Sequence, residues 1–150
     1  MERFKRNQLE EAIIRTLHAD ERRAHALKLR IKRLLVTDRR LGRKKGSRDK
    51  TGDARFAFHG QDPPGSGVEI MFSGYEAFAV CVGLILLEHG IPQGTVVSIL
   101  RSIRSDLELA HCETLKKDPG ILFDPEVVRA LAKPGMLATD NSAPVFVALF

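Results

Sequence analysis

The sequence predicts a mainly α-helical domain of the α+β class, with four to six helices and one small β-hairpin. Apolar residues recur at helical spacing along most of the 150 residues, and helix-capping residues precede several of these stretches. Residues 68–72 have the alternation of a half-buried strand, with Val68, Ile70 and Phe72 on one side. We expect residues 1–150 to form a single domain, because a chain of this length normally folds around one core.

Two helices are expected at the N-terminus, over residues 8–18 and 21–41. Asn7 precedes the first helix and Glu10 follows three positions later, which is the spacing of a capping box. Asp20 can cap the second helix after a short break in the apolar pattern.

The second helix has two different faces. Apolar residues at spacings of three, four and seven form a seam along one side, which Asp38 alone interrupts. The seam consists of Ala24, Leu27, Ile31, Leu34 and Leu41. Cations lie on the opposite side, where a turn of 100° per residue places three of them within about 20° of one another. These three are Arg22, Arg33 and Arg40, with Lys32 and Arg39 beside them.

A flexible basic linker is expected to follow this basic helical pair. Residues 1–42 hold the two helices, and Gly42 is a natural stop for the second. Residues 43–55 show no apolar periodicity, so burial cannot offset the entropy lost on ordering them. This linker contains Arg43, Lys44, Lys45 and Arg48, which could order on a phosphate backbone.

A β-hairpin with a long tip is predicted next. Its strands are residues 56–59 and residues 68–72, and in the second of these Val68, Ile70 and Phe72 alternate with Glu69 and Met71. Residues 60–67 are rich in glycine and proline and therefore form the loop between them.

The strongest capping box in the chain opens the following helix. Ser73 and Glu76 have the required spacing, and the helix is expected to run to about His89, with Gly90 ending it. Its apolar residues lie on all sides, which predicts a central, buried helix.

The remaining elements complete a helical core with a C-terminal strand. Pro92 begins a helix whose stripe continues to about Leu115, with an interruption near Ser105. A short helix is expected over Glu126–Ala132. The six apolar residues Val145–Phe150 indicate a buried strand, which could pair with the hairpin or with a second subunit.

Basic residues are concentrated in the first third of the chain. Residues 1–55 hold 18 of the 24 Lys+Arg and 8 of the 19 Asp+Glu, whereas residues 56–150 hold 6 and 11. This asymmetry is typical of a basic surface directed at a polyanion. Nucleic acid is the commonest such partner, while acidic proteins and membrane surfaces stay open as alternatives.

Neither a membrane-spanning helix nor a signal peptide is predicted. The longest uncharged apolar run, Ala77–Leu87, has eleven residues, and a membrane-spanning helix needs about 20. The basic N-terminus is not followed by the apolar stretch of a signal peptide. We therefore expect a cytoplasmic protein without membrane contact.

The residues that could support catalysis or metal binding do not form a recognisable motif in the sequence. None of the five histidines stands at a metal-ligand spacing, and Cys81 and Cys112 are 31 positions apart. His111 and Cys112 are adjacent, but neighbouring side chains on a helix point about 100° apart. We expect no catalysis, no cofactor and no metal. A small enzyme that uses His111 or His89 is a third alternative.

Residues 68–100 resemble the second half of a MerR-type winged-helix DNA-binding domain. In that family a wing strand leads into a helix that begins aromatic-Ser/Thr-x-x-acidic, as Phe72-Ser73-Gly74-Tyr75-Glu76 does in this chain. The family's helix end and the apolar pairs of its next helix are matched by Leu87-Glu88-His89-Gly90-Ile91-Pro92 and Val96-Val97-Ser98-Ile99-Leu100. The resemblance implies a winged-helix or helix-turn-helix-like fold.

The chain also departs from that family. The family's N-terminal helix-turn-helix and the Arg-Tyr-Tyr start of its wing have no counterpart in this sequence. The helices over residues 8–18 and 21–41 stand in that place, and their short break could be a divergent helix-turn-helix. The family's dimerising coiled coil and effector domain are also missing.

These observations predict a DNA-binding protein, a small bacterial-type transcriptional or nucleoid regulator. Double-stranded DNA is favoured over RNA because only Phe56 and Phe58 lie near the basic residues as stacking platforms. Loop 60–67 would act as the wing, and pairing of the C-terminal strand would give a homodimer with two half-sites. The residues expected to contact DNA are Arg22, Lys32, Arg33, Arg39, Arg40, Arg43, Lys44, Lys45 and Arg48.

The alternative is a non-catalytic protein–protein adaptor or a homo-oligomeric structural component that binds an acidic partner. Its interface would be the seam of Leu27, Leu34 and Leu41, or the terminal strand.

Overall fold

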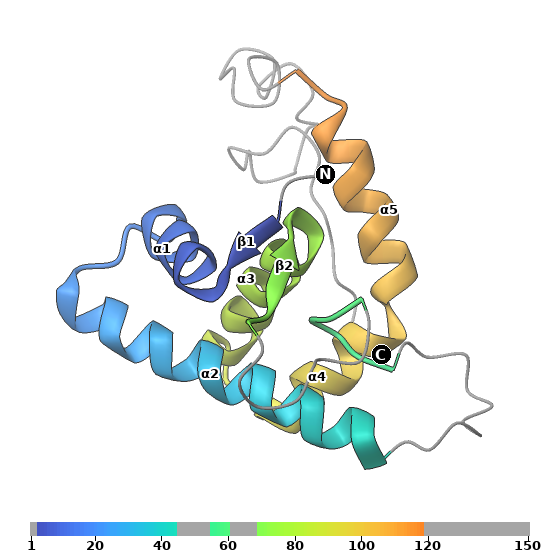
Figure 1. Ribbon diagram of the computed structural model, residues 1–150, viewed down its shortest axis with the longest axis horizontal. Coiled ribbons are helices and arrows are strands. Elements are labelled where there is room, and N and C mark those ends of the chain that lie inside the picture. Colours follow the sequence, from blue (N-terminus) through green and yellow to red (C-terminus); the bar gives the residue numbers. More distant parts are fainter. Residues whose placement is uncertain (1–2, 45–54, 61–68, 119–150) are drawn as a thin grey trace, which may run out of the picture. The chain divides into compact units, whose positions relative to one another are not determined.

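The computed structural model of the protein describes residues 3–44, 55–60 and 69–118 (Figure 1). Contacts divide the chain into two compact units, Met1–Leu109 and Ala110–Phe150. The described residues form five helices and one antiparallel pair of short strands, which confirms the mainly helical α+β class. None of the described helices is long and apolar enough to cross a membrane.

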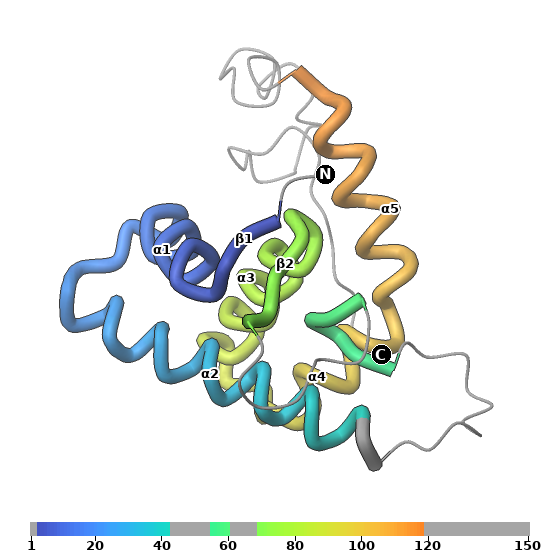
Figure 2. The backbone as a smooth tube through the Cα atoms, viewed as in Figure 1, coloured from blue at the N-terminus to red at the C-terminus, as the bar shows by residue number. Residues whose placement is uncertain are grey.

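The N-terminal part consists of strand β1 (Arg3–Lys5) followed directly by helix α1 (Arg6–Thr16) and helix α2 (Glu21–Lys44). Helix α1 begins before the predicted cap at Asn7, because the backbone N–H of Lys5 donates to Gln8 Oε1 at 2.8 Å. Asp20 caps α2 as predicted, since its Oδ1 accepts the Arg23 N–H at 2.7 Å. Figure 2 shows the short connection between the two helices.

The small sheet does not have the predicted hairpin connection. Strand β2 (Met71–Ser73) pairs antiparallel with β1, and Phe72 lies opposite Phe4. Residues 56–59 form bends rather than a strand. Their N–H groups are not available to a strand ladder, because Ala57 and Phe58 donate to the carboxylate of Asp38. The prediction that residues 56–59 pair with residues 68–72 is therefore wrong.

Helix α3 (Gly74–Glu88) begins at the predicted capping box. The N–H of Ser73 donates to Glu76 Oε2 at 2.6 Å, and the N–H of Glu76 donates to Ser73 Oγ at 3.2 Å. Gly90 follows the end of the helix with a φ of 84°, in the left-handed region that favours glycine. The predicted beginning and end of this helix are thus confirmed.

Helices α4 (Gln93–Ser102) and α5 (Arg104–Leu115) continue the predicted stripe, with a break at Ile103 close to the expected interruption. In the second unit the structure describes residues 110–118, which contain the end of α5. The predicted helix over Glu126–Ala132 and the predicted strand over Val145–Phe150 lie outside the described residues.

The core lies where α1, α3 and α4 contact α2. The predicted seam of α2 faces this core, and α3 contacts α1, α2, α4 and β2 as a central helix does. One side of α3 is less buried than predicted, since Ile85 is 40% exposed. Fully buried side chains of the core are Leu9, Leu27, Ile31, Leu34, Phe58, Phe72, Val80, Leu84, Val96, Val97 and Leu100.

Helix α2 extends past Gly42, which the sequence predicted as its stop. Gly42 is needed instead for close packing, because a Cβ atom there would lie 2.2 Å from Cε1 of Phe56. Phe56 is itself 3% exposed and fills this space. Arg43 and Lys44 therefore belong to the helix rather than to the predicted linker, and residues 45–54 lie outside the described residues.

Candidate nucleic-acid interface

Helix α2 carries a strongly basic surface. It has ten Lys and Arg residues but only two acids, Glu21 and Asp38. Its seam faces the core, so the side chains on the opposite side point to solvent. Four exposed cations there form what we call the basic face: Arg22, Lys32, Arg33 and Arg40. Their predicted orientation away from the seam is thus observed.

The cations on the flank of α2 nearest α3 are ion-paired, unlike those of the basic face. Arg23 Nη2 lies 3.0 Å from Glu88 Oε1, and Arg30 Nη1 lies 3.8 Å from the same atom. Within the described part of the chain, no carboxylate pairs with any residue of the basic face. Its charges are therefore available to an external anion.

Asp38 does not weaken the basic face, because it is fully buried on the other side of the helix. Its Oδ1 accepts hydrogen bonds from Arg101 Nη2 at 2.8 Å and from Arg101 Nε at 3.0 Å. The N–H groups of Ala57 and Phe58 each donate to this carboxylate at 3.0 Å. A buried charge needs a partner and hydrogen bonds, and Asp38 has both.

Charged side chains from two more helices, α3 and α5, hold residues 55–60. Arg104 Nη1 donates to the carbonyl oxygens of Phe56 at 2.7 Å and of His59 at 2.6 Å. The N–H of Gly60 donates to Glu76 Oε1 at 2.5 Å. Together with the Asp38–Arg101 pair, these bonds fix this segment, which follows the basic stretch of the sequence, against the helical core.

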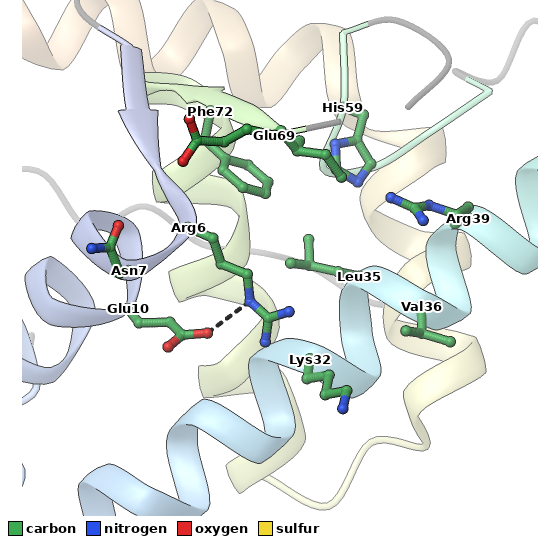
Figure 3. A pocket seen from close by; sticks show the side chains of 11 residues that line it. Arg6, Asn7, Glu10, Lys32, Leu35, Val36, Arg39, His59, Glu69 and Phe72 are labelled. Atoms are coloured by element: carbon green, nitrogen blue, oxygen red, sulfur yellow. Dashed lines mark hydrogen bonds and ion pairs between the residues drawn. The ribbon is translucent and has the colours of Figure 1, made fainter. Parts of the chain in front are cut away.

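A groove of about 630 Å³ lies along α2 and shares Lys32 with the basic face (Figure 3). Its lining comes from the start of α1, from α2, from His59 and from residues 69–72. Lys32 and Arg39 line it from α2, and Arg6 lines it from α1. The groove is thus a concave surface with cations on two of its sides.

His59 is a buried polar group at this groove, with 5% of its surface exposed. Burial lowers the pKa of its imidazole below the ordinary value of 6.5, and the Arg39 and Arg104 charges act in the same direction. Asp38 and Glu76 raise the pKa but do not outweigh burial. Among the described residues, Nε2 of His59 has no hydrogen-bond partner.

The structure describes only some of the other residues that the sequence predicted to contact DNA. Arg39 is half-buried and lines the groove instead of lying on the open side of α2. Arg43 and Lys44 are part of α2, and Lys45 and Arg48 lie outside the described residues. The predicted wing, residues 60–67, also lies outside them except for Gly60.

Three arginines were not predicted from the sequence: Arg6 lines the groove, Arg101 pairs with Asp38, and Arg104 binds the backbone of residues 56 and 59. Asp38 was the one local signal, because a carboxylate inside an apolar seam needs a cationic partner. The sequence did not show which of the distant arginines this would be, since Arg101 is 63 positions away.

The described residues show no cluster of three or more possible metal ligands. The two cysteines are free, and burial raises the pKa of the Cys81 thiol. His89 is exposed, and its Nδ1 lies 2.8 Å from the carbonyl oxygen of Ile85, one helical turn away. These groups do not converge on a common site.

Comparison with known proteins yields no relative for this chain: no family model, curated protein or solved structure matches it. The basic face and the groove are therefore the features of the chain that indicate a function.

Proposed function

We propose that the protein binds double-stranded DNA through the basic face of α2 and acts as a small transcriptional or nucleoid regulator. The observation that carries this proposal is the absence of carboxylate partners for these cations among the described residues, although other arginines of the same helix have them. Guanidinium and ammonium groups that are exposed and unpaired are the usual contacts to DNA phosphates.

The dimensions of α2 suit a duplex. At 1.5 Å per residue, Arg22 and Arg40 are separated by about 27 Å along the helix axis. This distance corresponds to about eight base pairs at 3.4 Å per step. The major groove is about 12 Å wide and admits one α-helix. Arg43, Lys44, Lys45 and Arg48 follow in the sequence and extend the proposed contact with the DNA backbone.

Duplex DNA fits better than single-stranded RNA. Sequence-specific RNA recognition commonly uses exposed aromatic rings on which bases stack. The two phenylalanines close to the basic residues in the sequence, Phe56 and Phe58, are 3% and 0% exposed and pack in the interior. They are therefore not available as stacking platforms.

The adaptor alternative loses one of its two proposed interfaces. Leu27 and Leu34 are 1% and 0% exposed, because the seam is already covered by the protein's own helices. The terminal strand lies outside the described residues. An acidic protein could still use the basic face, and a homodimer stays part of the proposal.

Fluorescence anisotropy with a random 30-base-pair duplex, repeated over a salt series, tests the proposal. We expect the logarithm of the affinity to fall with the logarithm of the salt concentration at a slope of about −4 or steeper, which corresponds to four or more phosphates. Polyglutamate is the matched polyanion for the acidic-protein alternative. No binding to the duplex at low salt, or tighter binding to polyglutamate, would contradict DNA binding.

A further inference from the structure

The groove along α2 has the charge pattern of an anion site. Its two carboxylates already have internal partners: Glu10 Oε1 lies 2.8 Å from Arg6 Nε, and Glu69 Oε2 lies 3.2 Å from Lys5 Nζ. Lys32 and Arg39 have no such partner among the residues that the structure describes. The uncompensated charge of the groove is therefore positive and comes from α2.

Apolar side chains form much of the remaining lining. Leu35 and Val36 lie between the two cations on α2, and Phe72 faces them from β2 (Figure 3). Ile70 also lines the groove. Val36 is 58% exposed, so the groove is open to solvent along this edge. A volume of about 630 Å³ lies within the range of about 300–1,000 Å³ that is typical of small-molecule sites.

One buried polar atom at the groove also lacks a partner. Nε2 of His59 makes no hydrogen bond to any described residue, although buried polar atoms are normally satisfied. The His59 ring lies 5.5 Å from the Phe72 ring, centroid to centroid. Figure 3 shows His59 and Arg39 near each other at one end of the groove. That end therefore combines an aromatic surface, a guanidinium group and an unsatisfied ring nitrogen.

We propose that this groove binds an amphipathic aromatic anion, a carboxylate or sulfonate attached to a flat apolar body. Lys32 and Arg39 would attract the anionic group from either end of this wall, and the apolar body would pack on Leu35, Val36 and Ile70 between them. A purely apolar ligand would leave the two cations unused, and an inorganic anion would leave the apolar wall exposed to water. This site is additional to DNA binding and does not depend on it.

The fluorescent sulfonate 1-anilinonaphthalene-8-sulfonate is a suitable probe, and N-phenyl-1-naphthylamine has the same aromatic body without the charge. We expect the sulfonate to bind the wild-type protein saturably, with one site per chain. The neutral probe should bind about tenfold more weakly. This is the loss expected when a charge interaction of about 1.4 kcal/mol is missing.

Two double variants locate the site. Lys32→Gln/Arg39→Gln removes the cations of the groove and should weaken sulfonate binding about tenfold. Arg33→Gln/Arg40→Gln removes the same charge from the same helix but not from the groove lining, and should leave the affinity unchanged. Circular dichroism and thermal unfolding should show that both variants fold as the wild type does.

Three results would overturn the proposal. These are the absence of saturable sulfonate binding, equal weakening by the two double variants, and equal affinities for the charged and neutral probes. None of these measurements contains DNA, so failure of the anion site and failure of DNA binding are distinguishable.

Discussion

The two sides of helix α2 differ in whether their charged side chains are paired. On the buried side, one carboxylate, Asp38, is paired with Arg101 and accepts two backbone N–H groups. On the exposed side, the basic face carries four cations without a carboxylate partner in the described part of the chain. Since desolvation makes a lone buried charge costly and water makes an exposed one tolerable, the first arrangement supports the fold and the second is free to bind a partner.

Because of this difference, mutations on the two sides of α2 should affect different properties of the protein. Substitutions on the buried side should reduce the free energy of unfolding. Substitutions on the basic face should leave stability intact and reduce binding to a polyanion.

Replacement of the buried carboxylate should have the largest effect. Asp38→Ala leaves Arg101 buried without a counter-charge and the Ala57 and Phe58 N–H groups without an acceptor. We expect a loss of about 3–5 kcal/mol in the free energy of unfolding, measured by urea denaturation. If Asp38→Ala fails to fold, Asp38→Asn should fold with an intermediate loss. A loss below about 1 kcal/mol for Asp38→Ala would contradict this role.

A methyl group added at Gly42 should have the next largest effect. Its Cβ would lie 2.2 Å from the buried ring of Phe56, and overpacking of this kind costs about 1–3 kcal/mol. Gly94→Ala is the matched control, because nothing lies within 4 Å of a Cβ at that position of α4. Phe56→Leu should restore part of the stability lost in Gly42→Ala. Equal stabilities of the two alanine variants would show that Phe56 does not require Gly42.

The pH dependence of stability should show a smaller effect from His59. Burial lowers the pKa of His59 in the folded protein below the ordinary value of 6.5 that applies in the unfolded chain. The unfolded chain therefore takes up the proton first as the pH falls, so stability is greatest above pH 6.5 and decreases below it. His59→Phe, which also removes the unpartnered Nε2, should flatten this decrease between about pH 6.5 and 5, measured by urea denaturation. The same slope in variant and wild type would assign the pH dependence to other groups.

The basic face should have the smallest effect on stability. Arg33→Gln changes an exposed side chain without an ion-pair partner in the described structure, so the free energy of unfolding should stay within about 0.5 kcal/mol of wild type. Thermal and urea unfolding check this expectation. A loss comparable to that of Gly42→Ala would mean that Arg33 supports the fold rather than a partner.

Local signals in the sequence account for most of the helical structure. The Ser73–Glu76 capping box, the Asp20 cap and the apolar seam of α2 each involve residues within a few positions of one another, and each was predicted correctly. The exposed positions of Arg22, Arg33 and Arg40 follow from the same helical periodicity.

The errors concern partners that are distant in the sequence. Strand β1 has three residues, too few to show alternation, and its partner β2 begins 66 positions after Lys5. Phe56-Ala57-Phe58 has the composition of a strand, but Asp38 and Arg104 take its backbone hydrogen bonds. Gly42 has the sequence context of a helix stop, whereas the ring of Phe56 determines its role. None of these partners could be identified from local sequence.

The salt dependence of DNA binding, compared between two triple variants, distinguishes binding through the basic face from binding elsewhere on the protein. Arg22→Gln/Arg33→Gln/Arg40→Gln removes three cations of the basic face. Arg6→Gln/Arg15→Gln/Arg23→Gln removes the same charge from arginines that are already paired with Glu10, Glu11 and Glu88. The first variant should flatten the log–log salt slope by about 2.7, which is 0.9 per lost phosphate contact, and the second should leave the slope nearly unchanged. Equal slopes for wild type and the first variant would contradict DNA binding through this face.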